Sequence, residues 1–220
     1  MDEALVKRIL ARYPHASPVQ RWHMRGRLQL CPYDALLSHL RGKASVLDIG
    51  CGFGHFAWYL AEKMPSLDYH GTDIDARKVD LALGCSLPEG LRPRFRAGEA
   101  ADIPDLPKEF GNIVILDVLY LLPWEAQVRL LDWALGRLAP GPDSSLVLKN
   151  MDAAEGFSGW RTLAEEWVMV HLFKRTRSSG TLLGARPAGD YAAFARDRGF
   201  RSEVEELPTF NPSFILRIHR

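Results

Sequence analysis

The stretch that decides the fold is Val46-Leu47-Asp48-Ile49-Gly50-Cys51-Gly52-Phe53-Gly54. An apolar, strand-like run ends in alternating glycines, and a helix-length segment follows at about 54–63. Glycine allows a tight turn and lets a ligand lie against the main chain, while the next helix presents free N–H groups. The stretch therefore predicts a strand, a ligand-binding loop and a helix. The glycines alone do not define the ligand, because nicotinamide- and flavin-binding proteins use similar turns and some such turns only pack a helix on a sheet.

From Ser45 onward, short apolar runs alternate with helix-length amphipathic segments, a pattern typical of a parallel sheet covered by helices on both faces. We expect seven strands, at 45–49, 68–73, 92–97, 112–117, 144–149, 201–207 and 213–219. The helices between them are expected at about 54–63, 76–84, 124–138 and 189–198, with Pro123 in the first turn of the third. The last two strands should form a hairpin, so that one strand runs antiparallel. The predicted fold class is α/β, doubly wound and mostly parallel.

Two additions accompany the predicted Rossmann-like domain of residues 45–220. Residues 1–44 precede the first strand and are expected to form a helical cap, and residues 151–187 an insert that covers the substrate, with a helix near 158–174. The cap is basic, with eight Lys and Arg against one acid between Leu5 and Ala44. This excess would suit an acidic partner, although the arginines could equally form a solvated face.

Bulk composition fits one globular domain, since 47% of the 220 residues are hydrophobic and 25% are charged. A net charge of +1 argues against a general polyanion binder. The most apolar run, 113–124, is interrupted and too short to span a bilayer, and the N-terminus lacks a signal pattern. We therefore expect a soluble, cytoplasmic protein. Three cysteines without a Cys-x-x-Cys pair indicate neither a disulfide framework nor a metal site.

A second acid, Asp73, ends the next predicted strand, in Tyr69-His70-Gly71-Thr72-Asp73. Neighbouring parallel strands end at the same edge of a sheet, so Asp73 is placed to accept hydrogen bonds from both hydroxyls of a ribose. The alternative is that Asp73 only caps the helix that begins near Ala76, although Asp75 is better placed for that role.

Four motifs in this order resemble those of class I S-adenosylmethionine-dependent methyltransferases: Val46–Gly54, Gly71–Asp75, Gly98–Asp102 and Ile115–Pro123. The resemblance covers most of 45–150, and the Gly-Cys-Gly-x-Gly form favours the methyl donor over a dinucleotide. It implies S-adenosylmethionine as the cofactor, converted to S-adenosylhomocysteine. Its methionine part would lie over the first loop, on Gly50, Cys51 and Gly52, and Asp48 could hold that loop or reach the donor's ammonium group through water. Asp73 and Ile74 would contact ribose and adenine.

The resemblance also implies an acid after the third strand that accepts a hydrogen bond from the adenine amino group, with the next backbone N–H on the ring. Glu99 and Ala100 take these positions if the strand register from Phe95 is kept. Asp102 fits instead if the loop shifts by three residues, and we favour Glu99. Asp117, at the end of the fourth strand, would border the methionine end and the opening to the acceptor.

More narrowly, the chain resembles a group of small bacterial methyltransferases that combine an aromatic and Arg-rich cap with two further motifs, here Asp117–Pro123 and Lys149–Asp152. In that group position 150 is commonly acidic. Asn150 could therefore alter proton handling or the choice of acceptor.

Methyl transfer from a sulfonium mainly requires water to be excluded and the nucleophile to be held in line, so few catalytic side chains are needed. A hydroxyl acceptor would gain from a general base, for which His23 in the cap and His171 in the insert are candidates. Tyr120 and Asp152, at strand ends, could orient the acceptor. For both histidines the alternative is a packing or surface role. His171 shares a helix face with Trp160 and Trp167, which either seats the insert or lines a pocket.

The expected function is methyl transfer to a small or carrier-linked metabolite at oxygen, with an acyl carrier protein or a phosphate-bearing substrate as the acidic partner. One alternative is an RNA methyltransferase that uses the Arg and Trp residues of the cap. Against it, Asp117-Val118-Leu119-Tyr120 lacks the Asn/Asp-Pro-Pro-aromatic sequence of base-amino methylation. The other alternative is a non-catalytic partner domain, which the intact glycine loop and Asp73 disfavour.

Overall fold

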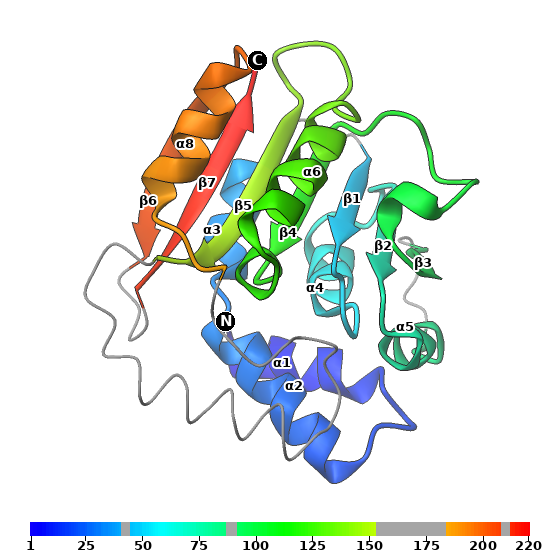
Figure 1. The fold of residues 1–220 in the computed structure, drawn as a ribbon. Coiled ribbons are helices and arrows are strands. Elements are labelled where there is room, and N and C mark those ends of the chain that lie inside the picture. Colours follow the sequence, from blue (N-terminus) through cyan, green and yellow to red (C-terminus); the bar gives the residue numbers. More distant parts are fainter. Residues whose placement is uncertain (41–44, 87–91, 153–183, 208–211) are drawn as a thin grey trace.

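The computed structural model describes residues 1–40, 45–86, 92–152, 184–207 and 212–220. Its centre is a seven-stranded sheet in the order β3-β2-β1-β4-β5-β7-β6 (Figure 1). The strands are β1 (Val46–Ile49), β2 (Tyr69–Asp73), β3 (Arg94–Ala97), β4 (Asn112–Leu116), β5 (Ser145–Met151), β6 (Arg201–Leu207) and β7 (Ser213–His219). Strands β1 to β5 pair in parallel, and β7 is antiparallel to both β5 and β6. The predicted fold class is confirmed.

Helices cover both faces of the sheet because successive strand residues point to opposite sides. On one face, Val46, Val114 and Val147 belong to a core shared with α4 (His55–Lys63), α5 (Ala76–Leu83) and the N-terminal helices. On the other face, Leu47, Ile113 and Leu146 share a core with α6 (Trp124–Leu135) and α8 (Ala188–Asp197). The result is a three-layer α/β/α arrangement.

Three helices form the N-terminal part: α1 (Glu3–Ala11), α2 (Pro18–Leu30) and α3 (Tyr33–His39). The start of α2 is fixed by a capping box, in which the Ser17 side chain accepts from the Gln20 amide and the Gln20 side chain from the Ser17 amide. The inward faces of α1 and α2 bury Val6, Ile9, Met24 and Leu28 in the same core as α4.

The basic side chains of this cap are largely bound within the chain. Arg12 pairs with Glu62 on α4 at 2.7 Å, and Arg25 pairs with Glu3 at 2.7 Å. Arg21 donates to main-chain carbonyls, including that of Leu10 at 2.9 Å. These arginines therefore anchor the cap, which weakens the prediction of a free basic surface. Arg41 and Lys43 lie outside the described residues.

Helix α6 differs from its sequence prediction at both ends. Helix α6 ends at Leu135, three residues early, and Pro123 is its extended N-cap instead of part of its first turn. Of the predicted insert, residues 153–183 lie outside the described part of the chain, and with them the helix near 158–174, Trp160, Trp167 and His171. Among the described helices, we find none with the length and apolar character needed to cross a membrane.

Candidate active site

The loop after β1 has a backbone shape that requires glycine. Gly50, Gly52 and Gly54 have φ angles of +80°, +56° and +75°, in the left-handed region. A Cβ atom on Gly50 would lie 2.3 Å from Cγ2 of Val118, and one on Gly54 would lie 2.7 Å from the Phe95 ring. The missing side chains thus let the loop pass directly against the segment after β4 and against β3.

Asp73, at the end of β2, holds this loop from the side. Its Oδ2 accepts from the Gly52 amide and its Oδ1 from the Asp75 amide, each at 2.8 Å. The predicted capping role of Asp75 is confirmed, because its side chain accepts from the Arg77 amide at the start of α5. A carboxylate offers about four lone-pair sites, so these two bonds leave acceptor capacity on Asp73. The adjacent Ile74 side chain is 66% exposed and available to an apolar ring.

Asp48 lies beneath the loop and is buried, and its Oδ2 accepts a short hydrogen bond from the Tyr69 hydroxyl. Burial raises the pKa of Asp48 to about 7, with the Tyr69 hydrogen bond opposing the rise and Asp73 adding to it. Cys51 is also buried, and burial raises the pKa of its thiol, which keeps it neutral. Both side chains therefore support the loop from within the fold.

A surface depression of about 580 Å³ lies beyond the end of β3. Glu99 and Asp102 both line it, so the two candidates for the adenine contact remain open. Glu99 precedes and Asp102 ends a short 3-10 helix, η1 (Ala100–Asp102), in which the Asp102 amide donates to the Glu99 carbonyl at 3.0 Å. Ala100 is buried at its start.

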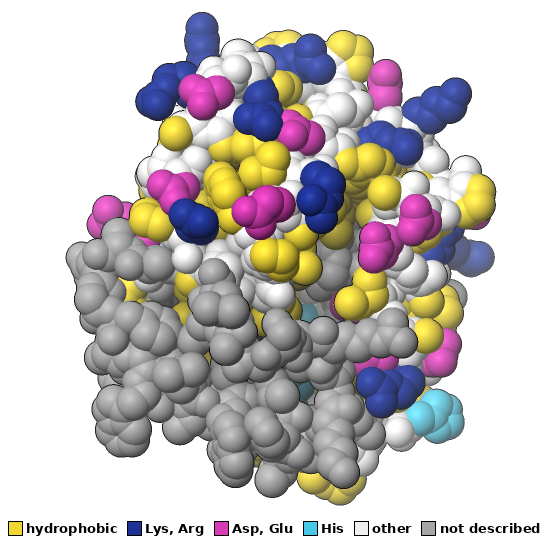
Figure 2. All heavy atoms as spheres, viewed as in Figure 1, with side chains coloured by type: hydrophobic (Ala, Val, Ile, Leu, Met, Phe, Trp, Pro, Cys, Tyr) yellow, Lys and Arg dark blue, Asp and Glu magenta, His cyan; other side chains and the backbone are white. Residues whose placement is uncertain are grey.

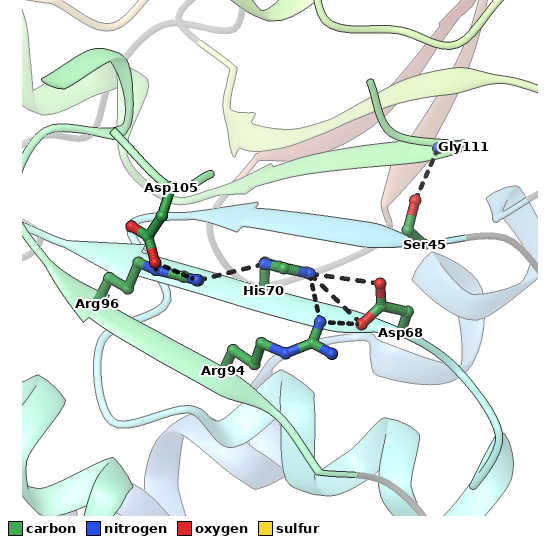
Figure 3. Close-up of polar contacts among 7 residues, drawn as sticks. All are labelled: Ser45, Asp68, His70, Arg94, Arg96, Asp105 and Gly111. Atoms are coloured by element: carbon green, nitrogen blue, oxygen red, sulfur yellow. Dashed lines mark hydrogen bonds and ion pairs between the residues drawn. The ribbon is translucent and has the colours of Figure 1, made fainter. Parts of the chain in front are cut away.

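One wall of the depression is fixed by a polar cluster on the edge strand (Figure 3). Arg96 on β3 donates to Asp105 at 2.9 Å, and a second nitrogen of its guanidinium lies 3.3 Å from Nδ1 of His70 on β2. The other ring nitrogen of His70 faces Arg94 and Asp68. Burial lowers the pKa of His70, so the imidazole is neutral and serves as a bridge between β2 and β3.

Asp117 directly follows β4 and has a φ of +58°, and among the described residues it is the one non-glycine with a positive φ. Its carboxylate pairs with Lys149 Nζ of β5 at 2.6 Å and with Arg27 Nη1 of α2 at 2.9 Å. Burial by itself would raise the pKa of Asp117, but the two cations lower it below its ordinary value. Asp117 is therefore an ionised group shared by the sheet and the cap.

Two neutral histidines lie between the cap and the loop. His23 on α2 makes an edge contact with the Phe53 ring, with centroids 6.2 Å apart, and His55 begins α4. Burial is the main reason that the pKa falls to about 4 for His23 and about 3 for His55, and the charge of Arg27 adds to both shifts. The hydroxyl of Tyr13 donates to the Phe53 carbonyl at 2.7 Å, which ties the cap to the loop.

Residues 46–141 match the sequence profile of a family described as a methyltransferase domain. These residues, which run from β1 to the turn before β5, form a methyltransferase domain. An uncharacterized protein of Synechococcus sp. is 32% identical to the chain over 123 residues, which are 55% of this chain and 28% of that protein. The chain thus spans little more than a quarter of this relative.

Solved structures share the fold of nearly the whole chain, not only of its methyltransferase domain. Magnesium protoporphyrin IX methyltransferase from Synechocystis PCC 6803 has a TM-score of 0.63 at 23% identity, with 98% of this chain and 93% of that chain covered. Mitomycin 7-O-methyltransferase has a TM-score of 0.66 at 21% identity, with 98% and 60% covered. At these identities the likeness concerns the fold.

The remaining candidates lie around the methyltransferase domain's open edge. Tyr120 is half-buried in the 3-10 helix η2 (Leu119–Leu121), and Asp152 directly follows β5. Asn150 points to the other face, where its amide donates to the Tyr191 hydroxyl at 2.9 Å. Its suggested influence on proton handling at the opening therefore finds no support in its position.

Sequence reasoning missed Arg27 and Lys149 as partners of Asp117. A lysine directly after the apolar run Leu146–Leu148 of β5 was a usable signal for Lys149, because a buried strand rarely carries an unpaired charge. Nothing local distinguishes Arg27 from the other arginines of α2.

Proposed function

We propose that this methyltransferase transfers the methyl group of S-adenosylmethionine to an oxygen atom of a small or carrier-linked metabolite. The observation that carries the proposal is the joint geometry of the glycine loop and Asp73. A Cβ on Gly52 would come no closer than 4.0 Å to another described part of the chain, so main chain is accessible there, and the Asp73 carboxylate is fixed 2.8 Å from the Gly52 amide at the same edge. A ligand with an amino-acid end and a ribose fits such a pair of elements.

The residues present offer a place for each part of the donor. We assign Gly50, Cys51 and Gly52 to its amino-acid end, Asp73 to the ribose hydroxyls and Ile74 to one face of the adenine. Glu99 or Asp102, with the Ala100 amide, would meet the adenine edge. The donor supplies an electrophilic methyl group on a sulfonium, so the chain's own task is to orient an acceptor and exclude water.

The state of His23 favours an acceptor oxygen that is already acidic. A histidine with a pKa of about 4 is neutral near pH 7 and can accept a proton, but it is a weaker base than one whose pKa matches the working pH. It therefore suits a phenol or a carboxylic acid better than an alcohol. Tyr120, in η2 after β4, and Asp152, directly after β5, are the proposed orienting groups.

A polyanionic acceptor is disfavoured by the surface charges. Within the described part of the face in Figure 2, Lys and Arg side chains are interspersed with Asp and Glu. The cap arginines that could have contacted phosphates are engaged with Glu62, Glu3 and main-chain carbonyls. A carrier-linked acceptor remains within the proposal, but it does not rest on a basic cap.

Calorimetric titration tests the donor assignment. The wild-type chain should bind S-adenosylmethionine and not NADH. Asp73→Asn should weaken this binding by about 10- to 100-fold, the range expected for a charge-assisted hydrogen bond of 1.5–3 kcal/mol. Asp75→Asn is the matched control, because Asn is as good an N-cap as Asp and affinity should not change. Binding of NADH, or an unchanged affinity in Asp73→Asn, would contradict the assignment.

A further inference from the structure

Three charged side chains meet where α2 passes the carboxyl ends of strands β4 and β5. Asp117 Oδ2 lies 2.9 Å from Arg27 Nη1, and Asp117 Oδ1 lies 2.6 Å from Lys149 Nζ. The cluster adjoins the donor loop, since a Cβ on Gly50 would collide with Val118, the residue after Asp117. A ligand on this loop would therefore lie within reach of the cluster.

Counted over the described residues, the cluster carries one positive charge in excess, because two cations share a single carboxylate. Within the described residues, Asp117 is the one acidic side chain that pairs with Arg27 or Lys149. The histidines beside the cluster do not alter this count, since His23 and His55 are neutral near pH 7. An uncompensated charge in a partly buried site is unfavourable, so the site favours one bound anion.

Exposure and geometry identify Arg27 as the group that would meet this anion. The Asp117 side chain is 6% exposed and that of Lys149 is 13% exposed, whereas that of Arg27 is 38% exposed. A guanidinium holds five N–H donors in a planar fork that matches a carboxylate, and the bond to Asp117 uses only Nη1. Asp117 in turn fixes the fork, because its own backbone is held in the left-handed region and its amide donates to the Lys149 carbonyl at 2.8 Å.

We propose that Arg27, positioned by Asp117 and assisted by Lys149, binds one carboxylate of a ligand at this edge. The inference rests on the proposed function and adds the charge that the ligand must carry there. Two ligands can supply a carboxylate: the amino-acid end of the methyl donor, or an acidic acceptor such as an aromatic or acyl carboxylic acid.

Calorimetry on wild type and Arg27→Met distinguishes these sources. In the first arm, S-adenosylmethionine is compared with 5′-methylthioadenosine, which lacks the amino-acid end. In the second, with S-adenosylhomocysteine saturating, 4-hydroxybenzoate is compared with 4-hydroxybenzamide and octanoate with octanamide. In one of the two arms, Arg27→Met should bind the compound that carries the carboxylate about tenfold or more weakly than wild type does. Its affinity for the matched compound without a carboxylate should be unchanged.

Arg25→Met is the matched control, because Arg25 lies on the same helix but pairs with Glu3 at the surface. Its ligand affinities should equal those of wild type. If Arg27→Met fails to fold, Arg27→Gln keeps a donor for Asp117 and removes only the charge. Equal binding by wild type and variant in both arms would overturn the carboxylate site. If wild type binds neither S-adenosylmethionine nor S-adenosylhomocysteine, the proposed function itself fails.

Discussion

The two sides of the candidate active site are shaped by different kinds of interaction. On the β1–β3 side, the shape comes from backbone, with Gly50 and Gly54 pressed against neighbours that leave no room for a Cβ. On the β4–β5 side, it comes from charge, with Asp117 held by Arg27 from 90 residues away and by Lys149 from 32 residues away. The left-handed glycines of the first side belong to one short loop, whereas the second side exists only after the cap has packed on the sheet.

Gly50→Ala would break the backbone side and should have the largest effect. The new Cβ would lie 2.3 Å from Val118, and φ is +80°. Left-handed strain and overpacking together should lower the free energy of unfolding by about 3 kcal/mol and abolish binding of the donor. Urea unfolding and calorimetry measure the two effects.

Gly26→Ala is the control for this substitution. Gly26 lies in the middle of α2, and a Cβ there would meet nothing within 4 Å. It should raise the free energy of unfolding by roughly 0.5–1 kcal/mol, since Ala is the better helix former. If both variants behave alike, the loop's need for glycine at position 50 has been misjudged.

This contrast explains how much the sequence could predict. The strand positions followed from the short apolar runs, and the strand bounds agree with the structure within a few residues because five of the seven strands are almost fully buried. The end of α6 at Leu135 was less predictable, since Gly136 and the turn after it continue a helix-compatible pattern.

The residues of the backbone side could be predicted from the sequence, whereas the ion pairs of the charge side could not. Asp48, Asp73 and the glycines could be placed from their positions at strand ends, because parallel strands end at one edge. The basic excess of the cap was read as a surface property, but Arg12 and Arg25 pair with acids that sequence proximity does not indicate. Ion pairs between distant segments depend on the packing of helices, which carries no local signal.

Asp117→Asn sharpens the comparison on the charge side. Asn also tolerates a φ of +58°, so the backbone should persist while two cations lose their shared carboxylate. The free energy of unfolding should fall by roughly 2 kcal/mol near pH 7, less than for a fully buried pair because Arg27 is partly exposed.

The contribution of Asp117 to the free energy of unfolding should depend on pH in a direction that its pKa predicts. The pKa of Asp117 is lowered from its ordinary 3.8, so its contribution is fully present above that pH and is lost as the pH falls through the lowered pKa. The stability difference between wild type and Asp117→Asn should therefore hold from neutral pH down to the ordinary pKa and narrow below it. Asp132→Asn, which breaks the exposed pair with Arg198, should change stability by about 1 kcal/mol at most. A pH-independent gap would show that Asp117 acts through its shape and not its charge.

The smallest effect concerns the depression beyond β3, where a carboxylate is expected to contact the adenine. Glu99 and Asp102 both line it, and only one of them should accept from an adenine amino group. S-inosylhomocysteine lacks that amino group, so wild type should prefer S-adenosylhomocysteine over it. Glu99→Gln should reduce this preference by about 1 kcal/mol, roughly fivefold, whereas Asp102→Asn should leave it intact. The reverse result would assign the contact to Asp102 and shift the loop by three residues. If neither variant alters the preference, the adenine lies elsewhere, and the backbone side of the site ends at Ile74.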